Sequence, residues 1–329
     1  MAPAVAGETV VIGSCSGTVY GLDAAEGQLR WSYDTSADGP AAQFHGEALV
    51  RKGNVIIGAD GPAKAHLYAF DASTGELRWK RPFGHGVPTR ILAFDASIAF
   101  VTGDGILTSV DPSDGRVRWT FEPEGRIEGR QRVSAVSNGD AVLFHAPDGE
   151  LHLFDAASGK KRMQVAIGSP PAADPAFIGR DFVAATESGV ITRIDGRSGR
   201  IVAQRKLSGR MYGSLQSDGN RVFALVLRAR EAAVVALDSR LQIEWEQTAS
   251  GEWSFRPLVR DGKLFIGRND GLCSLDTADG AVECVPVSGA VRGIALDGGR
   301  SYVGTTGGVV YAVPVARRGE MTDKDSCRE

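Results

Sequence analysis

Arginine recurs at one position in this sequence, a few residues ahead of successive short apolar segments. The arginines are Arg90, Arg132, Arg210, Arg256 and Arg292, and His45 takes that position in an earlier segment. A guanidinium is a planar fork that matches a carboxylate or a phosphate, so arginines that converge on one rim would bind an anion. Tyr212 and Trp253 accompany them and would add a polar tip and a flat apolar wall. The pattern therefore predicts an anion-binding site.

The same arginines have a structural interpretation, in which they pair with acidic side chains of a neighbouring segment. Acidic residues in an adjacent set of predicted loops are Asp60, Asp104, Glu187 and Asp270. Exposed ion pairs of this kind contribute little to stability. The sequence leaves the binding and the structural interpretation open.

An enzyme built on this rim would need a group that moves a proton, and His45, His85 and Tyr212 are the candidates. An arginine would stabilise developing negative charge, as in a lyase or cyclase acting on a carboxylated substrate. The sequence contains neither a nucleophile elbow nor a phosphate-binding loop. A catalytic role is therefore the second choice.

The histidines are not spaced as zinc ligands. They are His45, His66, His85, His145 and His152. A zinc site normally includes a short-range pair of ligands, and a calcium loop needs several closely spaced acidic residues. We therefore expect no metal and no cofactor. His152 is expected to face the core or a neighbouring sheet.

These side chains require a scaffold that brings distant segments to one place, and a repeat of about 40 residues provides it. Each copy has an apolar strand that ends at an Asp and a small polar turn. The residues at that position are Asp23, Asp71, Asp111, Asp155, Asp195, Asp238 and Asp276, with Pro314 in a degenerate eighth copy. Short strands repeated at this interval predict a radial array.

The first copy, residues 2–33, divides into four short strands separated by turns. Gly27 is free to take a positive φ in the turn after Asp23, and residues 29–33 alternate apolar and polar as a half-exposed outer strand does. Four antiparallel strands form one propeller blade. We therefore predict an all-β, eight-bladed β-propeller of four-stranded antiparallel blades, with the last blade incomplete. It forms one domain over residues 1–315, followed by a polar tail over 316–329.

Each innermost strand is expected to follow an arginine-bearing loop, so that the loops meet at one mouth of the central channel. The expected first residues are Pro3, Ala48, Ala93, Ala135, Pro175, Leu215, Leu258 and Ile294.

A tryptophan follows the Asp by seven or eight residues in four copies. These are Trp31, Trp79, Trp119 and Trp245. An indole repeated on outer strands is expected to pack between neighbouring blades. Met163, Ala203 and Cys284 stand there in other copies. Those contacts should be weaker, because the smaller side chains bury less apolar surface.

Residues 17–31 and 67–79 resemble the PQQ-type propeller repeat with its tryptophan-docking turn, and are similar to the propellers of outer-membrane assembly lipoproteins. The resemblance extends from residue 3 to about residue 315 and implies the fold. It does not select a function, because the family also holds quinoprotein dehydrogenases, sensor domains and binding modules.

The resemblance implies two adjacent cysteines above the cofactor of a quinoprotein dehydrogenase. The cysteines of this chain are Cys15, Cys273, Cys284 and Cys327, and none are neighbours. This chain is also much shorter than a typical member of that class, so PQQ-dependent redox activity is the least favoured function.

Cys273 and Cys284 lie opposite each other if a turn closes between Asp276 and Ala281. We interpret them as two small buried residues, one in the place of a docking tryptophan. A disulfide in an oxidising compartment is the alternative.

A net charge of −3 gives no general attraction to nucleic acid. No apolar run approaches 18 residues, so no transmembrane segment is expected. Because no signal peptide precedes Pro3, the protein is either cytoplasmic or exported with its leader removed. We predict a monomeric binding or scaffold propeller whose Arg-rich mouth receives an anionic small molecule or a protein partner.

Overall fold

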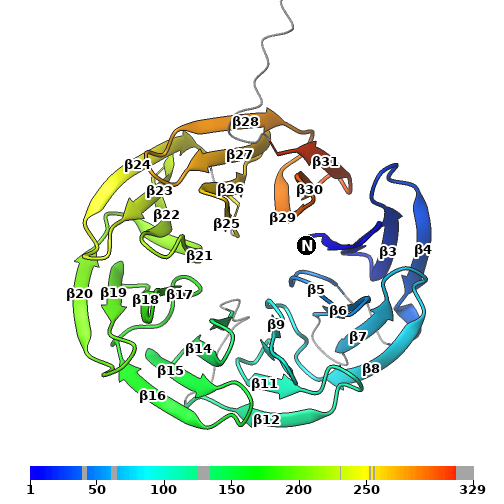
Figure 1. Cartoon of the computed structure of the whole chain (residues 1–329), viewed down its shortest axis with the longest axis horizontal. Coiled ribbons are helices and arrows are strands. Elements are labelled where there is room, and N and C mark those ends of the chain that lie inside the picture. The colour runs from blue at the N-terminus through cyan, green and yellow to red at the C-terminus, as the bar shows by residue number, and fades with distance from the viewer. Residues whose placement is uncertain are drawn as a thin grey trace, which may run out of the picture.

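A computed structural model places the described residues in a closed ring of eight antiparallel sheets around one axis (Figure 1). The structure describes residues 1–38, 43–60, 65–124, 134–229, 231–251, 253–254 and 256–315. Seven blades have four strands and the last has three, so the predicted propeller with an incomplete last blade is confirmed. No helix in these ranges has both the length and the apolar character that a membrane crossing requires.

Strands follow chain order within each blade, and the first strand lies nearest the axis (Figure 1). Blade 1 comprises β1 (Ala4–Ala6), β2 (Thr9–Gly13), β3 (Thr18–Asp23) and β4 (Leu29–Asp34), followed by the 3-10 helix η1 (Ser36–Asp38). Blade 2 comprises β5 (Leu49–Arg51), β6 (Asn54–Gly58), β7 (Ala65–Asp71) and β8 (Leu77–Phe83). Blade 3 comprises β9 (Leu92–Ala93), β10 (Ile98–Val101), β11 (Leu107–Val110) and β12 (Val117–Phe121). Blade 4 comprises β13 (Val136–Ser137), β14 (Ala141–His145), β15 (Glu150–Asp155) and β16 (Lys161–Ala166).

The second half of the ring continues in the same way. Blade 5 comprises β17 (Ala176–Ile178), β18 (Asp181–Ala185), β19 (Val190–Ile194) and β20 (Ile201–Lys206). Blade 6 comprises β21 (Arg210–Ser217), β22 (Val222–Arg228), β23 (Glu231–Leu237) and β24 (Ile243–Ser250). Blade 7 comprises β25 (Leu258–Arg260), β26 (Lys263–Gly267), β27 (Gly271–Asp276) and β28 (Val282–Pro286). Blade 8 comprises β29 (Val291–Asp297), β30 (Arg300–Thr305) and β31 (Val310–Pro314).

Burial within a blade depends on the distance from the perimeter. Both faces of the second strand are covered by neighbouring blades, so β10 and β14 are buried at every position. A continuous apolar run suits such a strand. The outer strand β16 instead alternates between exposed and half-buried residues. The core therefore lies in the seams between blades, and each seam holds the ends of its two blades in place.

The repeated tryptophans dock on the next blade, as predicted. The Trp31 indole N–H donates to the backbone carbonyl of Ala72, at 3.0 Å. Gly75, in the same turn, has a φ of +74°, and a Cβ there would lie 2.5 Å from the Trp31 ring. Only glycine fits both demands. Equivalent indole N–H groups donate from Trp79 to Pro112, from Trp119 to Ala156 and from Trp245 to Thr277.

The repeated Asp caps its own turn, and in blades 1 to 4 it also holds an arginine of the outer strand. In blade 2, Asp71 Oδ1 accepts the backbone N–H groups of Ser73 and Thr74, and Oδ2 accepts a hydrogen bond from Arg78. These donors lower the pKa of Asp71, with the Ser73 hydroxyl contributing most. The repeat therefore encodes turn closure at these positions.

Cys273 and Cys284 form a disulfide, which corrects our preference for two small buried residues. The Asp276 N–H donates to the Ala281 carbonyl and closes the turn, so the two cysteines are direct cross-strand partners. Cys273 is buried, but Cys284 is exposed because β28 is an outer strand.

Candidate functional site at the channel mouth

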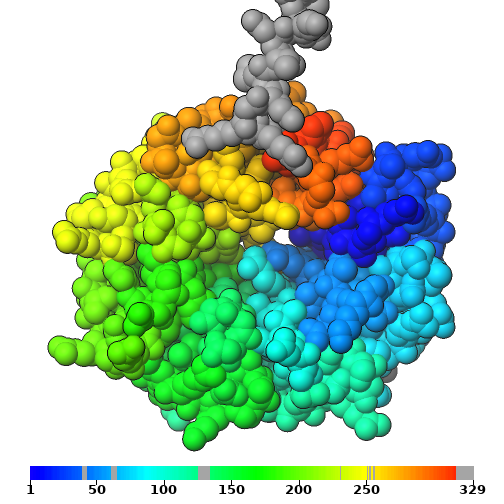
Figure 2. Space-filling view, viewed as in Figure 1, coloured from blue at the N-terminus to red at the C-terminus, as the bar shows by residue number. Residues whose placement is uncertain are grey.

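Antiparallel pairing determines which turns share an end of the ring. The segment that enters β5 meets the turn between β6 and β7, where Gln43 and Asp60 exchange two backbone hydrogen bonds. We call this end, formed by the segments that enter innermost strands and by the second-to-third-strand turns, the channel mouth. The turns between third and fourth strands lie at the opposite end. In the space-filling view, the ring is hollowed at its centre (Figure 2).

Two of the predicted arginines converge at this mouth on one internal carboxylate. Arg90 Nε lies 2.7 Å from Glu47 Oε2, and Arg256 Nη1 lies 3.3 Å from Glu47 Oε1. Glu47 and Arg256 are 209 residues apart in sequence, so this contact crosses between blades 2 and 7. The exposed fraction of the three side chains is 18% for Glu47, 24% for Arg90 and 18% for Arg256. We call these three residues the Glu47 clasp.

The two arginine charges together affect the pKa of Glu47 more strongly than its burial does. Burial by itself raises the pKa of Glu47, but the positive charges of Arg90 and Arg256 lower it to about 2. The same attraction raises the pKa of Arg90, with Glu47 as the main cause. The clasp is therefore fully ionised at neutral pH, and an external anion would have to displace the Glu47 carboxylate.

Asp174 is connected to the Glu47 clasp through Ser134. We call the clasp together with Ser134, Asp174 and Ser214 the polar belt. Its Oδ2 accepts a hydrogen bond from the Ser214 hydroxyl at 2.6 Å, and its Oδ1 accepts the Ser134 N–H at 2.5 Å. The Arg90 N–H in turn donates to the Ser134 hydroxyl. Burial raises the pKa of Asp174, although the charges of Arg256 and Arg90 act in the opposite direction. The belt thus links residues at the innermost strands of six blades, from blade 2 to blade 7.

Arg210 and Arg292 lie on strands rather than in the loops before them, because two innermost strands begin early. β21 starts at Arg210 instead of Leu215, and β29 starts at Val291 instead of Ile294. An irregularity in each strand accommodates the additional residues. Both arginines are exposed. Arg132 lies outside the described residues.

Arg292 shares the mouth with Arg256 and Asp60. Burial lowers the pKa of the Met1 amino group, Arg256 and Arg292 lower it further, and Asp60 opposes them. These charges therefore lie within electrostatic reach of one point.

Tyr212 and Trp253 are buried, with exposed fractions of 5% and 2%. The Trp253 indole N–H donates to the Ala232 carbonyl at 3.2 Å, and the Tyr212 hydroxyl donates to the Trp253 carbonyl at 3.4 Å. Both rings pack in the core between blades 6 and 7, because the early start of β21 carries Tyr212 into the sheet.

The two histidines proposed as proton carriers each face a carboxylate. His45 Nδ1 lies 2.8 Å from Asp60 Oδ2, and His45 Nε2 lies 3.9 Å from Cys15 Sγ. His85 Nε2 lies 3.7 Å from Asp104 Oδ2, and this histidine is 64% exposed. Asp60 and Asp104 thus have histidine partners, whereas the structural interpretation of the sequence paired them with the arginines. Among the described residues, the group of three metal-type ligands is Asp148, Glu150 and His152, at the turn between β14 and β15, and it includes none of the predicted arginines and neither of these two histidines.

Sequence reasoning missed Glu47 and Asp174, which hold the arginines and serines of the belt. A signal was present, because both residues lie two positions before the first residue of an innermost strand, as Arg90 does. The structure joins Glu47 to Arg90 and Asp174 to Ser214 in parallel bridges between neighbouring blades.

A family model described as outer membrane protein assembly factor BamB matches residues 1–60, 38–185 and 187–316. BamB of Yersinia pestis is 24% identical over 336 residues, which cover 94% of this chain and 83% of that protein. The crystal structure of BamB from Moraxella catarrhalis has a TM-score of 0.74 at 20% identity, over 95% of this chain and 93% of that one. A quinohemoprotein alcohol dehydrogenase of Pseudomonas putida, ADH IIB, is 35% identical over 77 residues, only 22% of this chain and 11% of that enzyme.

Proposed function

Because this chain belongs to the propeller family described as outer membrane protein assembly factor BamB, we propose that it is a non-catalytic scaffold that binds a partner protein at the channel mouth. The observation that carries the proposal is the extent of the family match, which reaches from residue 1 to residue 316. A propeller offers its loops and strand edges as the surface for a partner.

The charges at the mouth support binding over catalysis. Glu47 engages Arg90 and Arg256, and each carboxylate oxygen of Asp174 accepts a hydrogen bond. A catalytic acid or base needs reach to a substrate proton, whereas these groups are directed at one another. Arg210 and Arg292 remain exposed on the same end of the ring. We propose that they receive an acidic segment of the partner, which steers association and fixes its register.

The disulfide supports a role outside the cytoplasm. Disulfides persist in oxidising compartments such as the periplasm, and Cys273 and Cys284 form one here. We therefore propose that the protein acts in an exported location, as the description of its relatives also suggests.

Photo-crosslinking in the source organism tests this proposal. A photoreactive phenylalanine derivative would replace Arg210 or Arg292 at the mouth, and Arg116 as the matched control. Arg116 is 79% exposed and lies in the turn between β11 and β12, at the opposite end of the ring. We expect a protein-sized adduct at the two mouth positions and none at position 116.

Other outcomes would count against the proposal. Adducts confined to position 116, or no adduct at any position, would overturn binding at the mouth. An addition of small-molecule mass at the mouth would instead indicate a small anion that competes with Glu47 for its arginines. A further variant would carry the photoreactive residue at His85, which is 64% exposed. Replacing both Arg210 and Arg292 by glutamate in that variant should abolish its protein adduct, because acidic residues would repel an acidic partner.

A further inference from the structure

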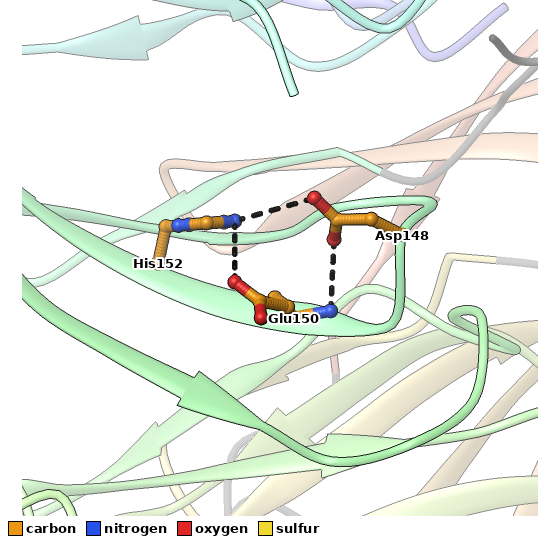
Figure 3. Close-up of side chains that lie close together, drawn as sticks. All are labelled: Asp148, Glu150 and His152. Atoms are coloured by element: carbon orange, nitrogen blue, oxygen red, sulfur yellow. Dashed lines mark hydrogen bonds and ion pairs between the residues drawn. The ribbon is translucent and has the colours of Figure 1, made fainter. Parts of the chain in front are cut away.

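Blade 4 carries two carboxylates and one imidazole that point toward one another (Figure 3), and none of them belongs to the Glu47 clasp. Asp148 ends the turn after β14, and Glu150 and His152 follow on β15. Alternate residues of a strand share one face, which places Glu150 and His152 together, and the hydrogen bond from the Glu150 N–H holds Asp148 beside them. One ligand atom from each lies within 4.8 Å of the others.

The histidine of this cluster is buried without a hydrogen bond. Its side chain is 2% exposed, and neither ring nitrogen has a hydrogen-bond partner. Nε2 is directed at Asp148 Oδ2 at 3.8 Å and at Glu150 Oε2 at 4.0 Å, beyond hydrogen-bonding range. A buried polar nitrogen without a partner is costly, which indicates that something else satisfies it.

The two carboxylates are held in place by the turn and by the outer strand. The Glu150 N–H donates to Asp148 Oδ1 at 2.9 Å, which leaves Oδ2 free to face His152. The Gln164 amide on β16 donates to Glu150 Oε2. The exposed fraction is 17% for Asp148 and 29% for Glu150, so solvent reaches the oxygens but not the imidazole.

We propose that Asp148, Glu150 and His152 bind a divalent transition-metal ion of the Zn²⁺ class at the seam between blades 3 and 4. Metal–nitrogen and metal–oxygen bonds of about 2.0 to 2.2 Å place two ligands of one ion no more than about 4.2 Å apart. The two distances from Nε2, 3.8 and 4.0 Å, lie inside that limit. The carboxylate oxygens of Asp148 and Glu150, which lie within 4.8 Å of each other, would need to approach by less than about 1 Å to meet the same limit.

The ligand set selects the ion. Carboxylates alone favour Mg²⁺ or Ca²⁺, whereas an imidazole favours Zn²⁺ and its neighbours in the first transition row. The Phe121 ring of blade 3 packs against His152 at 4.7 Å and fixes its orientation. Three protein ligands leave one position of a tetrahedral ion to water or to a partner's side chain.

Isothermal titration of ZnCl₂ into untagged protein, freed of metal by a chelator, tests the site. We expect one tightly bound equivalent. Asp148→Asn and Glu150→Gln should each weaken binding on the order of 100-fold, because each removes a charged ligand. Both side chains are partly exposed, so these variants should keep the wild-type circular dichroism spectrum. MgCl₂ and CaCl₂ should bind much more weakly than ZnCl₂.

Matched variants separate this site from the other ligand pair. Glu187 lies in the corresponding turn of blade 5, between β18 and β19. Glu187→Gln should therefore leave Zn²⁺ binding unchanged. Cys15 and His45 also face each other, at 3.9 Å, so Cys15→Ser should likewise change nothing. Loss of binding in Cys15→Ser with retention in Asp148→Asn would overturn the proposal. So would the absence of Zn²⁺ binding to the wild type, or tighter binding of Ca²⁺.

Discussion

Replacing Glu47 by glutamine would remove the shared partner of Arg90 and Arg256 and leave two largely buried guanidiniums uncompensated. The pKa of about 2 for Glu47 lies roughly 2 units below the value of about 4.3 for an unperturbed Glu. One unit corresponds to about 1.4 kcal/mol, so ionised Glu47 contributes about 3 kcal/mol to the free energy of unfolding. Loss of one partner from a buried ion pair costs a similar amount, about 3 to 5 kcal/mol.

Urea denaturation of the wild type and of Glu47→Gln, followed by tryptophan fluorescence between pH 7 and pH 2, measures this contribution. The folded pKa is depressed, so the stabilisation is complete above the unfolded pKa of about 4.3 and is lost as the pH falls toward 2. We therefore expect a difference of about 3 kcal/mol at pH 7 that decreases steadily below about pH 5. Carboxylates elsewhere titrate in both proteins, so their effects cancel in the difference.

A matched control is Glu76→Gln, whose carboxylate is 64% exposed and pairs with Arg78. An exposed pair is worth less than about 0.5 kcal/mol, so this variant should unfold almost as the wild type does. Arg256→Met should cost less than Glu47→Gln, because it retains the shorter contact between Glu47 and Arg90. A difference between wild type and Glu47→Gln that is independent of pH would refute the assigned role of the clasp.

The remaining predictions concern the seams and the disulfide. Trp31→Ala should lower the free energy of unfolding by about 3 to 5 kcal/mol, because it removes an indole that is only 8% exposed and leaves a cavity. Trp31→Phe should cost less, since it keeps a ring and loses mainly the hydrogen bond to Ala72; equal losses in urea titrations would contradict this mechanism. Reduction of the Cys273–Cys284 bond, which closes a loop with a separation of 11 residues, should cost about 3 kcal/mol. A denaturation midpoint that is the same with and without dithiothreitol would argue that the bond does not form in solution.

The repeat made the fold predictable because its signals are local. In each of the first three copies the turn Asp, the turn glycine and the docking tryptophan lie within about ten residues of one another, and each encodes a hydrogen bond or a contact with the adjacent blade. Even the incomplete last blade was readable, because the sequence after Pro314 soon becomes polar and contains no convincing fourth apolar strand. Local periodicity is enough to specify a ring of similar units.

The candidate sites depended on contacts between distant blades. The arginines were visible in the sequence, but the partner of Arg256 lies 209 residues away, and no local pattern pairs it with Glu47. Likewise, the spacing of Asp148, Glu150 and His152 places them on one face, but only packing against Phe121 buries the imidazole and leaves its nitrogens without hydrogen bonds. Periodic sequence thus determined the blades, whereas closure of the ring decided which charges meet, because ion pairing and burial depend on three-dimensional distance rather than on order along the chain.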